Sequence, residues 1–210
     1  MKIKAVGFDI DGTLYPNLSM YISSSASFIG HPLLVFHFSK VRKEIRRTEY
    51  SGDFRETQAK LLAYSMKISQ QKAADLIERY LYQKWEYSFK GVKPFKDVRP
   101  GLLSLKREGI KLGTLSDFPV QRKLDFLGLS DLMEFAFSSE ETGYLKPHSA
   151  PFINLISKFG VSPDEILYVG NNYKYDVLGA KNAGLRTAHL TRKPVSDSKA
   201  DFSFYSFLDL

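Results

Sequence analysis

The chain has 210 residues, 43% of them hydrophobic, and a formal net charge of +7 at pH 7. A chain of this length can bury a substantial core, either as one domain or as a domain with an insertion. It contains no cysteine, which excludes disulfides, zinc–thiolate sites and thiol catalysis and fits a reducing compartment.

The N-terminal residues 1–8 lack the long apolar stretch of a signal peptide. Residues 20–38 are fairly apolar, but serines and the pair His31-Pro32 interrupt them, so no membrane span is expected. We therefore expect a cytoplasmic protein without a membrane partner. The positive charge suits an anionic substrate, although much of it falls on helical positions that suit a solvated face.

The first predicted element is a strand over residues 3–8, a mostly apolar run that suits a buried parallel strand. Asp9 and Asp11 follow where this strand ends, and Gly12 and Thr13 come next. Two acids so close together are unfavourable unless a cation or a proton relieves their repulsion. The motif therefore predicts a metal site, an acid–base pair, or a carboxylate nucleophile with a helper.

Two other structures share the pattern Asp-x-Asp-Gly. Asp and Gly are common in surface turns, and on this motif alone a turn is as good an interpretation as a functional site. A calcium loop needs an acidic bidentate ligand at its twelfth position. Counted from Asp9, that position is Met20, which excludes the calcium loop.

From residue 15 to 92 the sequence pattern is helical. Helices are predicted over residues 33–45, 53–66 and 69–87. Asp53, with Glu56 three residues later, is a start signal for the second of these helices. The third carries an apolar stripe that ends at Trp85, a pattern more typical of a packed core than of a ligand site.

After residue 93 helices and strands alternate. Strands are predicted over residues 111–115, 134–137, 166–169 and 187–190, and helices over 102–108, 120–127, 150–159 and 175–183. Such alternation is typical of right-handed βαβ units and a parallel sheet. The sequence therefore predicts an α/β fold with a helical insertion after the first strand.

Polar residues follow three of the predicted strands. They are Asp9 and Asp11, then Ser116 and Asp117, and finally Asn171 and Asn172 with Asp176 a few residues on. Lys146, followed by Pro147, lies in the loop between the last two groups. Because ligands of open α/β sheets bind outside the carboxyl ends of the strands, we expect these side chains to lie close together.

In this order the segments resemble the motifs of the haloacid dehalogenase-like hydrolase superfamily. Residues 8–14 resemble the first motif, Leu115-Ser116-Asp117 the second, Lys146-Pro147 the third and residues 170–176 the fourth. The insertion resembles the C1-type helical cap of the phosphoglycolate phosphatase-like subfamily. The resemblance implies a Rossmann-like core over residues 1–14 and 93–210, with an α-helical cap domain over residues 15–92.

The resemblance also implies a Mg²⁺-dependent phosphatase that hydrolyses a small phosphomonoester. Asp9 would be the nucleophile that forms an aspartyl-phosphate, and Asp11 the general acid and base. The residues implied to bind the phosphoryl group are Thr13, Ser116, Asp117 and Lys146. Those implied to hold Mg²⁺ are Asp9, the backbone carbonyl of Asp11, Asp176 and Asn171. Asn171 stands where the family usually has an acid, so an active enzyme with weaker Mg²⁺ affinity is expected.

Asp11 favours phosphate-ester hydrolysis over carbon–halogen cleavage, because dehalogenases of the superfamily lack an acid at that place. A phosphomutase would use the same residues, and residues 13–16 also resemble pyrimidine 5′-nucleotidases. A binding module that has lost catalysis is supported by Asn171 alone. Nucleic-acid binding is supported by the net charge alone, so no nucleic-acid partner is expected. The expected partner is a small phosphorylated metabolite, bound by a monomer or a homodimer.

The cap is expected to select the substrate, because it would close over the site. Its candidate residues are Tyr15, Asn17, Arg42, Lys43, Arg46, Arg47, Arg55 and the aromatic residues near Trp85. Residues of these types are more often exposed to solvent or packed in the core than in contact with a substrate.

Overall fold

The computed structural model describes residues 2–19, 30–50, 52–193 and 195–210. Its sheet has six strands in the order β3-β2-β1-β4-β5-β6, and all neighbouring strands are parallel. The strands are β1 (Ala5–Phe8), β2 (Lys111–Ser116), β3 (Phe135–Ser138), β4 (Ile166–Gly170), β5 (Arg186–Leu190) and β6 (Phe202–Phe204). This confirms the predicted α/β fold.

Strand β1 lies at the centre of the sheet, between β2 and β4. Phe8 is in register with Thr114 of β2 and with Val169 of β4, so the polar residues that follow these three strands emerge side by side. Strand β6 was missed from the sequence, because three residues are too few to show a strand pattern.

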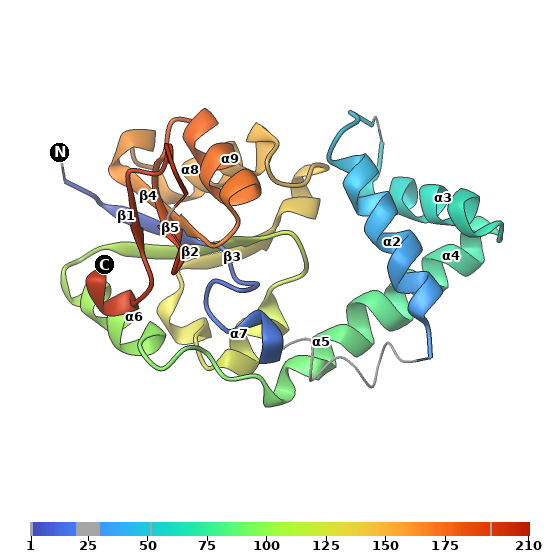
Figure 1. Ribbon diagram of the computed structural model, residues 1–210, viewed down its shortest axis with the longest axis horizontal. Helices are drawn as coiled ribbons and strands as arrows, with labels where there is room; N and C mark the ends of the chain where they lie inside the picture. Colours follow the sequence, from blue (N-terminus) through green and yellow to red (C-terminus); the bar gives the residue numbers. More distant parts are fainter. Residues whose placement is uncertain (1, 20–29, 51, 194) are drawn as a thin grey trace.

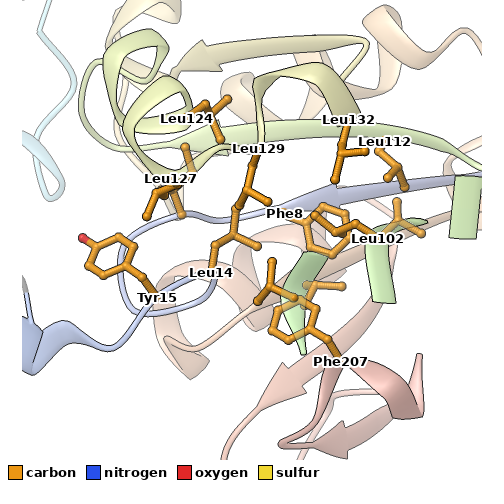
Figure 2. Close-up of a cluster of buried hydrophobic side chains, with 14 of the residues drawn as sticks. Phe8, Leu14, Tyr15, Leu102, Leu112, Leu124, Leu127, Leu129, Leu132 and Phe207 are labelled. Atoms are coloured by element: carbon orange, nitrogen blue, oxygen red, sulfur yellow. The ribbon is translucent and has the colours of Figure 1, made fainter. Parts of the chain in front are cut away.

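Helices cover both faces of the sheet (Figure 1). One face carries α6 (Val98–Arg107) and α7 (Gln121–Leu127), and the other carries α8 (Ser149–Phe159) and α9 (Leu178–Asn182). The cluster beneath α6 and α7 includes Phe8, Leu102 and Phe207, which pack together in Figure 2. Phe152 and Tyr168 belong to the cluster on the opposite face.

Short one-turn helices complete this part of the chain. They are η3 (Ser130–Leu132), η4 (Ser139–Thr142), η5 (Pro163–Glu165), the π-helical η6 (Tyr173–Val177) and η7 (Phe207–Asp209). Helix α6 begins four residues before the predicted start. Pro100 is accommodated there because the first turn of a helix leaves its N–H groups without intrahelical partners.

The insertion is helical and extends to one side of the sheet (Figure 1). It contains α2 (Pro32–Ile45), α3 (Phe54–Met66), α4 (Gln70–Leu76), the π-helical η1 (Ile77–Lys84), α5 (Trp85–Ser88) and η2 (Phe89–Gly91). The Asp53 side chain accepts a hydrogen bond from Glu56 N at 2.8 Å, which confirms the predicted helix start. The helix predicted over residues 69–87 is continuous in the structure, but its middle part, η1, is π-helical, and Ile77, Leu81 and Tyr82 of this part are buried.

The insertion has a hydrophobic cluster of its own, built around Leu34, Phe38 and Leu62. Leu145, from the loop after η4, is the buried residue of this cluster that lies outside the insertion. The separate cluster supports the proposed division into a core and a cap. Within the described ranges, no helix is both long and apolar enough to cross a bilayer; residues 20–29 of the predicted apolar stretch lie outside those ranges.

Gly101 on α6 provides a test of the packing between this helix and the C-terminal segment. A Cβ at this position would lie 2.4 Å from the backbone oxygen of Phe207. We expect Gly101→Ala to lower the free energy of unfolding by about 1–3 kcal/mol in urea titrations, as overpacking does elsewhere. Gly91→Ala is the control, since no atom lies within 4 Å of the added methyl. Equal stability of the two variants would contradict the close contact.

Candidate active site

A buried lysine joins two of the predicted site carboxylates. Lys146 Nζ lies 2.7 Å from Asp9 Oδ1 and 2.6 Å from Asp176 Oδ1. It also lies 3.3 Å from the hydroxyl oxygen of Tyr168, which donates to the Leu115 carbonyl. All three charged side chains are at least nine-tenths buried, so the ends of β1 and β4 and the loop before α8 meet at one point.

Burial and the neighbouring charges act on the pKa values of Asp9 and Lys146 in opposite directions. Burial raises the pKa of Asp9; the Lys146 ammonium opposes this rise, and the carboxylates of Asp176 and Asp11 add to it. Burial alone would lower the pKa of Lys146, but the carboxylates of Asp176 and Asp9 hold it well above its ordinary value. Lys146 is therefore a permanent positive charge next to Asp9.

Asp11 is bound by three side chains. Lys123 Nζ lies 2.9 and 2.8 Å from its two carboxylate oxygens. The Tyr15 hydroxyl donates to Oδ1 at 2.6 Å, and the Ser116 hydroxyl donates to Oδ2 at 2.9 Å. Burial alone would raise the pKa of Asp11, but the charge and hydrogen bond of Lys123 and the bonds from Tyr15 and Ser116 lower it. Asp11 is therefore held as a carboxylate.

Sequence reasoning missed Lys123. Its side chain is fully buried, and its Nζ lies 4.2 Å from the centre of the Trp85 ring. A signal was available in the predicted helix over residues 120–127. Lys123 shares a helix face with Val120, Leu124 and Leu127, and a lysine on an apolar face must find a buried partner.

Thr13 connects Asp9 to the loop after β4. Its hydroxyl donates to Asp9 Oδ2 at 2.8 Å and accepts from Asn171 N at 3.1 Å. Gly12 adopts a φ of +85°, and a Cβ there would lie 2.4 Å from the side-chain amide nitrogens of Asn17 and Asn171. The first and fourth predicted motifs are thus packed directly against each other.

The Asp117 carboxylate is occupied by contacts within the protein, and its role in binding phosphate stays a prediction. Its Oδ1 accepts from the Ser139 hydroxyl at 2.7 Å and from Lys146 N at 3.1 Å, and its Oδ2 pairs with Arg46 at 2.7 Å. Burial would raise its pKa, but the charges of Lys146, Arg46 and Arg42 lower it to about 2. Because a carboxylate repels phosphate, these contacts suit a structural role of the Asp117 side chain.

The oxygen donors near Asp9 fit a hard divalent cation. The carboxylates of Asp9 and Asp176 already converge on one positive charge, and the Thr13 hydroxyl, which contacts Asp9, also lies 3.3 Å from Asn171 Oδ1. Mg²⁺ is commonly held by one or two carboxylates and several waters. Among the described residues, no cluster of three or more His, Cys, Asp or Glu side chains is arranged to hold a metal. A cation here would therefore depend on two carboxylates, the Asn171 amide and backbone carbonyls.

The candidate cap residues fall into two groups. Tyr15, Arg42 and Arg46 point toward the sheet, where they bond Asp11, Glu140 and Asp117 respectively. Asn17 lies beside Gly12, and Trp85 packs on Lys123. The remaining candidates are exposed on the insertion: Lys43 on α2, Arg47 in the turn after α2, and Arg55, which pairs with Glu78 at 3.2 Å.

The model of the haloacid dehalogenase-like hydrolase family matches residues 3–184 of the chain. The chain belongs to this family. The match spans β1, the helical insertion and the strands that carry the four motifs, which confirms the resemblance drawn from the motifs.

Relatives with assigned activities are named as phosphatases. The chain is 27% identical to a phosphoglycolate phosphatase of Mannheimia succiniciproducens, covering 100% of this chain and 97% of the relative. It is 28% identical to the pyrophosphatase PpaX of Bacillus cereus, with 100% and 95% covered. It is 29% identical to a glyceraldehyde 3-phosphate phosphatase of Methanopyrus kandleri, with 93% and 87% covered.

Solved structures with the same fold include a 2-haloacid dehalogenase from Pseudomonas syringae pv. Tomato DC3000. Its TM-score is 0.73 at 22% identity, and 99% of this chain and 96% of that chain are covered. A phosphatase of the family from Thermococcus onnurineus gives a TM-score of 0.66 at 21% identity, with 99% and 95% covered. At these identities the likeness shows the fold alone.

The Asp117 ion pair predicts a pH-dependent part of the stability. Because the folded-state pKa is about 2 and the ordinary value is 3.8, the ionised pair stabilises the fold above about pH 4 and is lost as the pH falls toward 2. We expect the free energy of unfolding of the protein to exceed that of Asp117→Asn by an amount that shrinks by about 2 kcal/mol across this window. Urea unfolding from pH 5 downward measures it; a constant difference would contradict the assignment.

Proposed function

We propose that this hydrolase is a Mg²⁺-dependent phosphatase that cleaves a small phosphomonoester through an aspartyl-phosphate on Asp9. The observation that carries the proposal is the placement of Asp9 at the centre of the site. One of its oxygens contacts Lys146 and the other contacts Thr13, and Asp11 follows two residues later. Phosphoryl transfer requires mainly positioning and neutralisation of charge, which these groups supply.

In the first step a carboxylate oxygen of Asp9 attacks phosphorus while the bond from phosphorus to the leaving oxygen breaks. Asp11 donates a proton to that oxygen, and it must first take up this proton, because the free site stabilises its carboxylate form. In the second step Asp11, now ionised, takes a proton from water as the water attacks phosphorus, and the bond from phosphorus to Asp9 breaks. The second step needs the carboxylate form of Asp11, which Lys123 and Tyr15 stabilise.

The phosphoryl oxygens would be bound by the hydroxyls of Thr13 and Ser116 and by the Lys146 ammonium. Asp9, Asp176, Asn171 and the Asp11 carbonyl would hold Mg²⁺, which when bound neutralises charge on the phosphate. Asn171 removes one negative charge from this set, so weaker Mg²⁺ binding is the expected consequence.

The relatives named as phosphatases support a small phosphorylated metabolite as the substrate. Their names cover three different phosphorylated compounds, so the reaction class is common to them and the substrate is not. We propose that the cap selects the substrate and that the protein acts as a monomer or a homodimer.

Asp9→Asn tests the nucleophile. We expect the variant to release phosphate from a panel of phosphate esters at least about 10³-fold more slowly than the wild type, as loss of a nucleophile does in other covalent enzymes. Release by the wild type is expected to stop when EDTA removes Mg²⁺. The panel includes phosphoglycolate, sugar phosphates and nucleoside monophosphates. Asp75→Asn is the matched control, because Asp75 is exposed on the cap. Turnover by Asp9→Asn at the wild-type rate would overturn the mechanism.

Asp11→Asn tests the acid–base role. With p-nitrophenyl phosphate, whose leaving group needs little protonation, we expect a burst of p-nitrophenol of up to one equivalent per enzyme. The burst is followed by turnover slower by about 10²–10⁴-fold, because no base activates water. Stopped-flow absorbance measures both phases. A variant with no burst and unchanged steady-state turnover would contradict the acid–base role. Transfer of the phosphoryl group to a sugar instead of to water would favour the phosphomutase.

A further inference from the structure

Arg46 lies near the end of cap helix α2, with its side chain between the cap and the sheet. Only 15% of this side chain is exposed. Its neighbour Arg47 points to solvent. The sequence offers both as candidate substrate-binding residues, so the difference between them is a property of the tertiary structure.

The guanidinium of Arg46 contacts segments of three of the four motifs. Its Nη2 pairs with Asp117 Oδ2 at 2.7 Å, and its Nε donates to the Lys146 carbonyl at 3.1 Å. Its central carbon lies 4.6 Å from the centre of the Tyr175 ring, one residue before Asp176. A single cap side chain therefore joins the second, third and fourth motifs.

These contacts leave Arg46 poorly suited to bind a substrate. Its third nitrogen, Nη1, donates to the Arg42 carbonyl at 3.3 Å, so each nitrogen of the guanidinium already has a protein acceptor. Its charge is matched by the Asp117 carboxylate. The planar fork of arginine can serve several acceptors at fixed angles, which a lysine cannot do.

Arg42, one turn earlier on α2, strengthens the same connection. It is buried, pairs with Glu140 and donates to the Asp117 carbonyl. Tyr82 of the cap donates to the second oxygen of Glu140 at 2.9 Å. The cap thus binds Asp117, the residue directly after Ser116, at two places: Arg42 contacts its backbone carbonyl and Arg46 contacts its carboxylate.

We propose that Arg46 is a positioning residue, by which the cap fixes the segments that carry Ser116, Lys146 and Asp176. This inference rests on the proposed phosphatase function, in which Ser116 and Lys146 bind the phosphoryl group. Because groups that bind a transition state act through their geometry, small displacements of these segments lower the rate of the chemical step. The cap is then part of the catalytic apparatus even where it does not touch the substrate.

The test compares Arg46→Met and Arg46→Lys with the control Arg79→Met, an exposed arginine of the cap. We expect Arg46→Met to lower kcat by about 10- to 100-fold, the range found for groups that orient ligand-binding residues. Its KM stays within about twofold of the wild type. Arg46→Lys keeps the ion pair with Asp117 and loses the other contacts, so its kcat is expected to lie between those of the wild type and Arg46→Met.

Thermal unfolding before each assay confirms that every variant is fully folded at the assay temperature, so that kcat refers to folded protein. A KM that rises while kcat is retained would overturn the proposal and make Arg46 a substrate-binding residue. Kinetics of Arg46→Met equal to those of Arg79→Met would overturn it as well.

Amide hydrogen exchange tests the same inference without a substrate. We expect residues 115–118, 143–146 and 172–176 to exchange faster in Arg46→Met than in Arg79→Met, because three contacts to these segments are lost. Equal exchange would overturn the inference. Faster exchange in a protein whose wild type turns over no ester of the panel would instead leave the positioning intact and refute the phosphatase function.

Discussion

The buried contact of Lys146 with Asp9 and Asp176 is the interaction on which the site depends. Three charged side chains are removed from water here, which is tolerated only because each lies within 2.7 Å of an opposite charge. The contact also joins β1, the loop before α8 and η6, which are far apart in the sequence. Loss of the lysine would leave two buried carboxylates facing each other without a cation.

A second buried pair extends this arrangement toward the cap. Lys123 binds both oxygens of Asp11 and packs beneath Trp85 and Phe89, which belong to the segment leading back from the cap. The helical insertion therefore contacts the site on two sides: through these aromatic rings next to Asp11, and through Arg42 and Arg46 next to Asp117. The proposed acid–base residue and the segments proposed to bind phosphate are both held in place by contacts that cross from the insertion to the sheet.

The relatives place these features in context. The family match covers β1 to α9, and the phosphatase-named relatives span nearly the full chain at 27–29% identity. Dehalogenases share the fold at lower identity. Asp11, held by Lys123, Tyr15 and Ser116, is the feature of this chain that favours ester hydrolysis, since an expelled halide needs no proton.

The sequence by itself determined the α/β fold, the family and the order of the motifs, because strand and helix periods and strand-end acids are local patterns. Even the helix start at Asp53 was predictable, since a cap is a local hydrogen bond. Strand β6 and the π-helical turn of η1 were not predictable from such patterns. Only the tertiary structure decided that Lys123 binds Asp11, that Asp117 faces Arg46, and that Arg46 is mostly covered while Arg47 is exposed. The physical reason is that the partner of a buried charge comes from another part of the chain, and a one-dimensional pattern shows the charge without showing its partner.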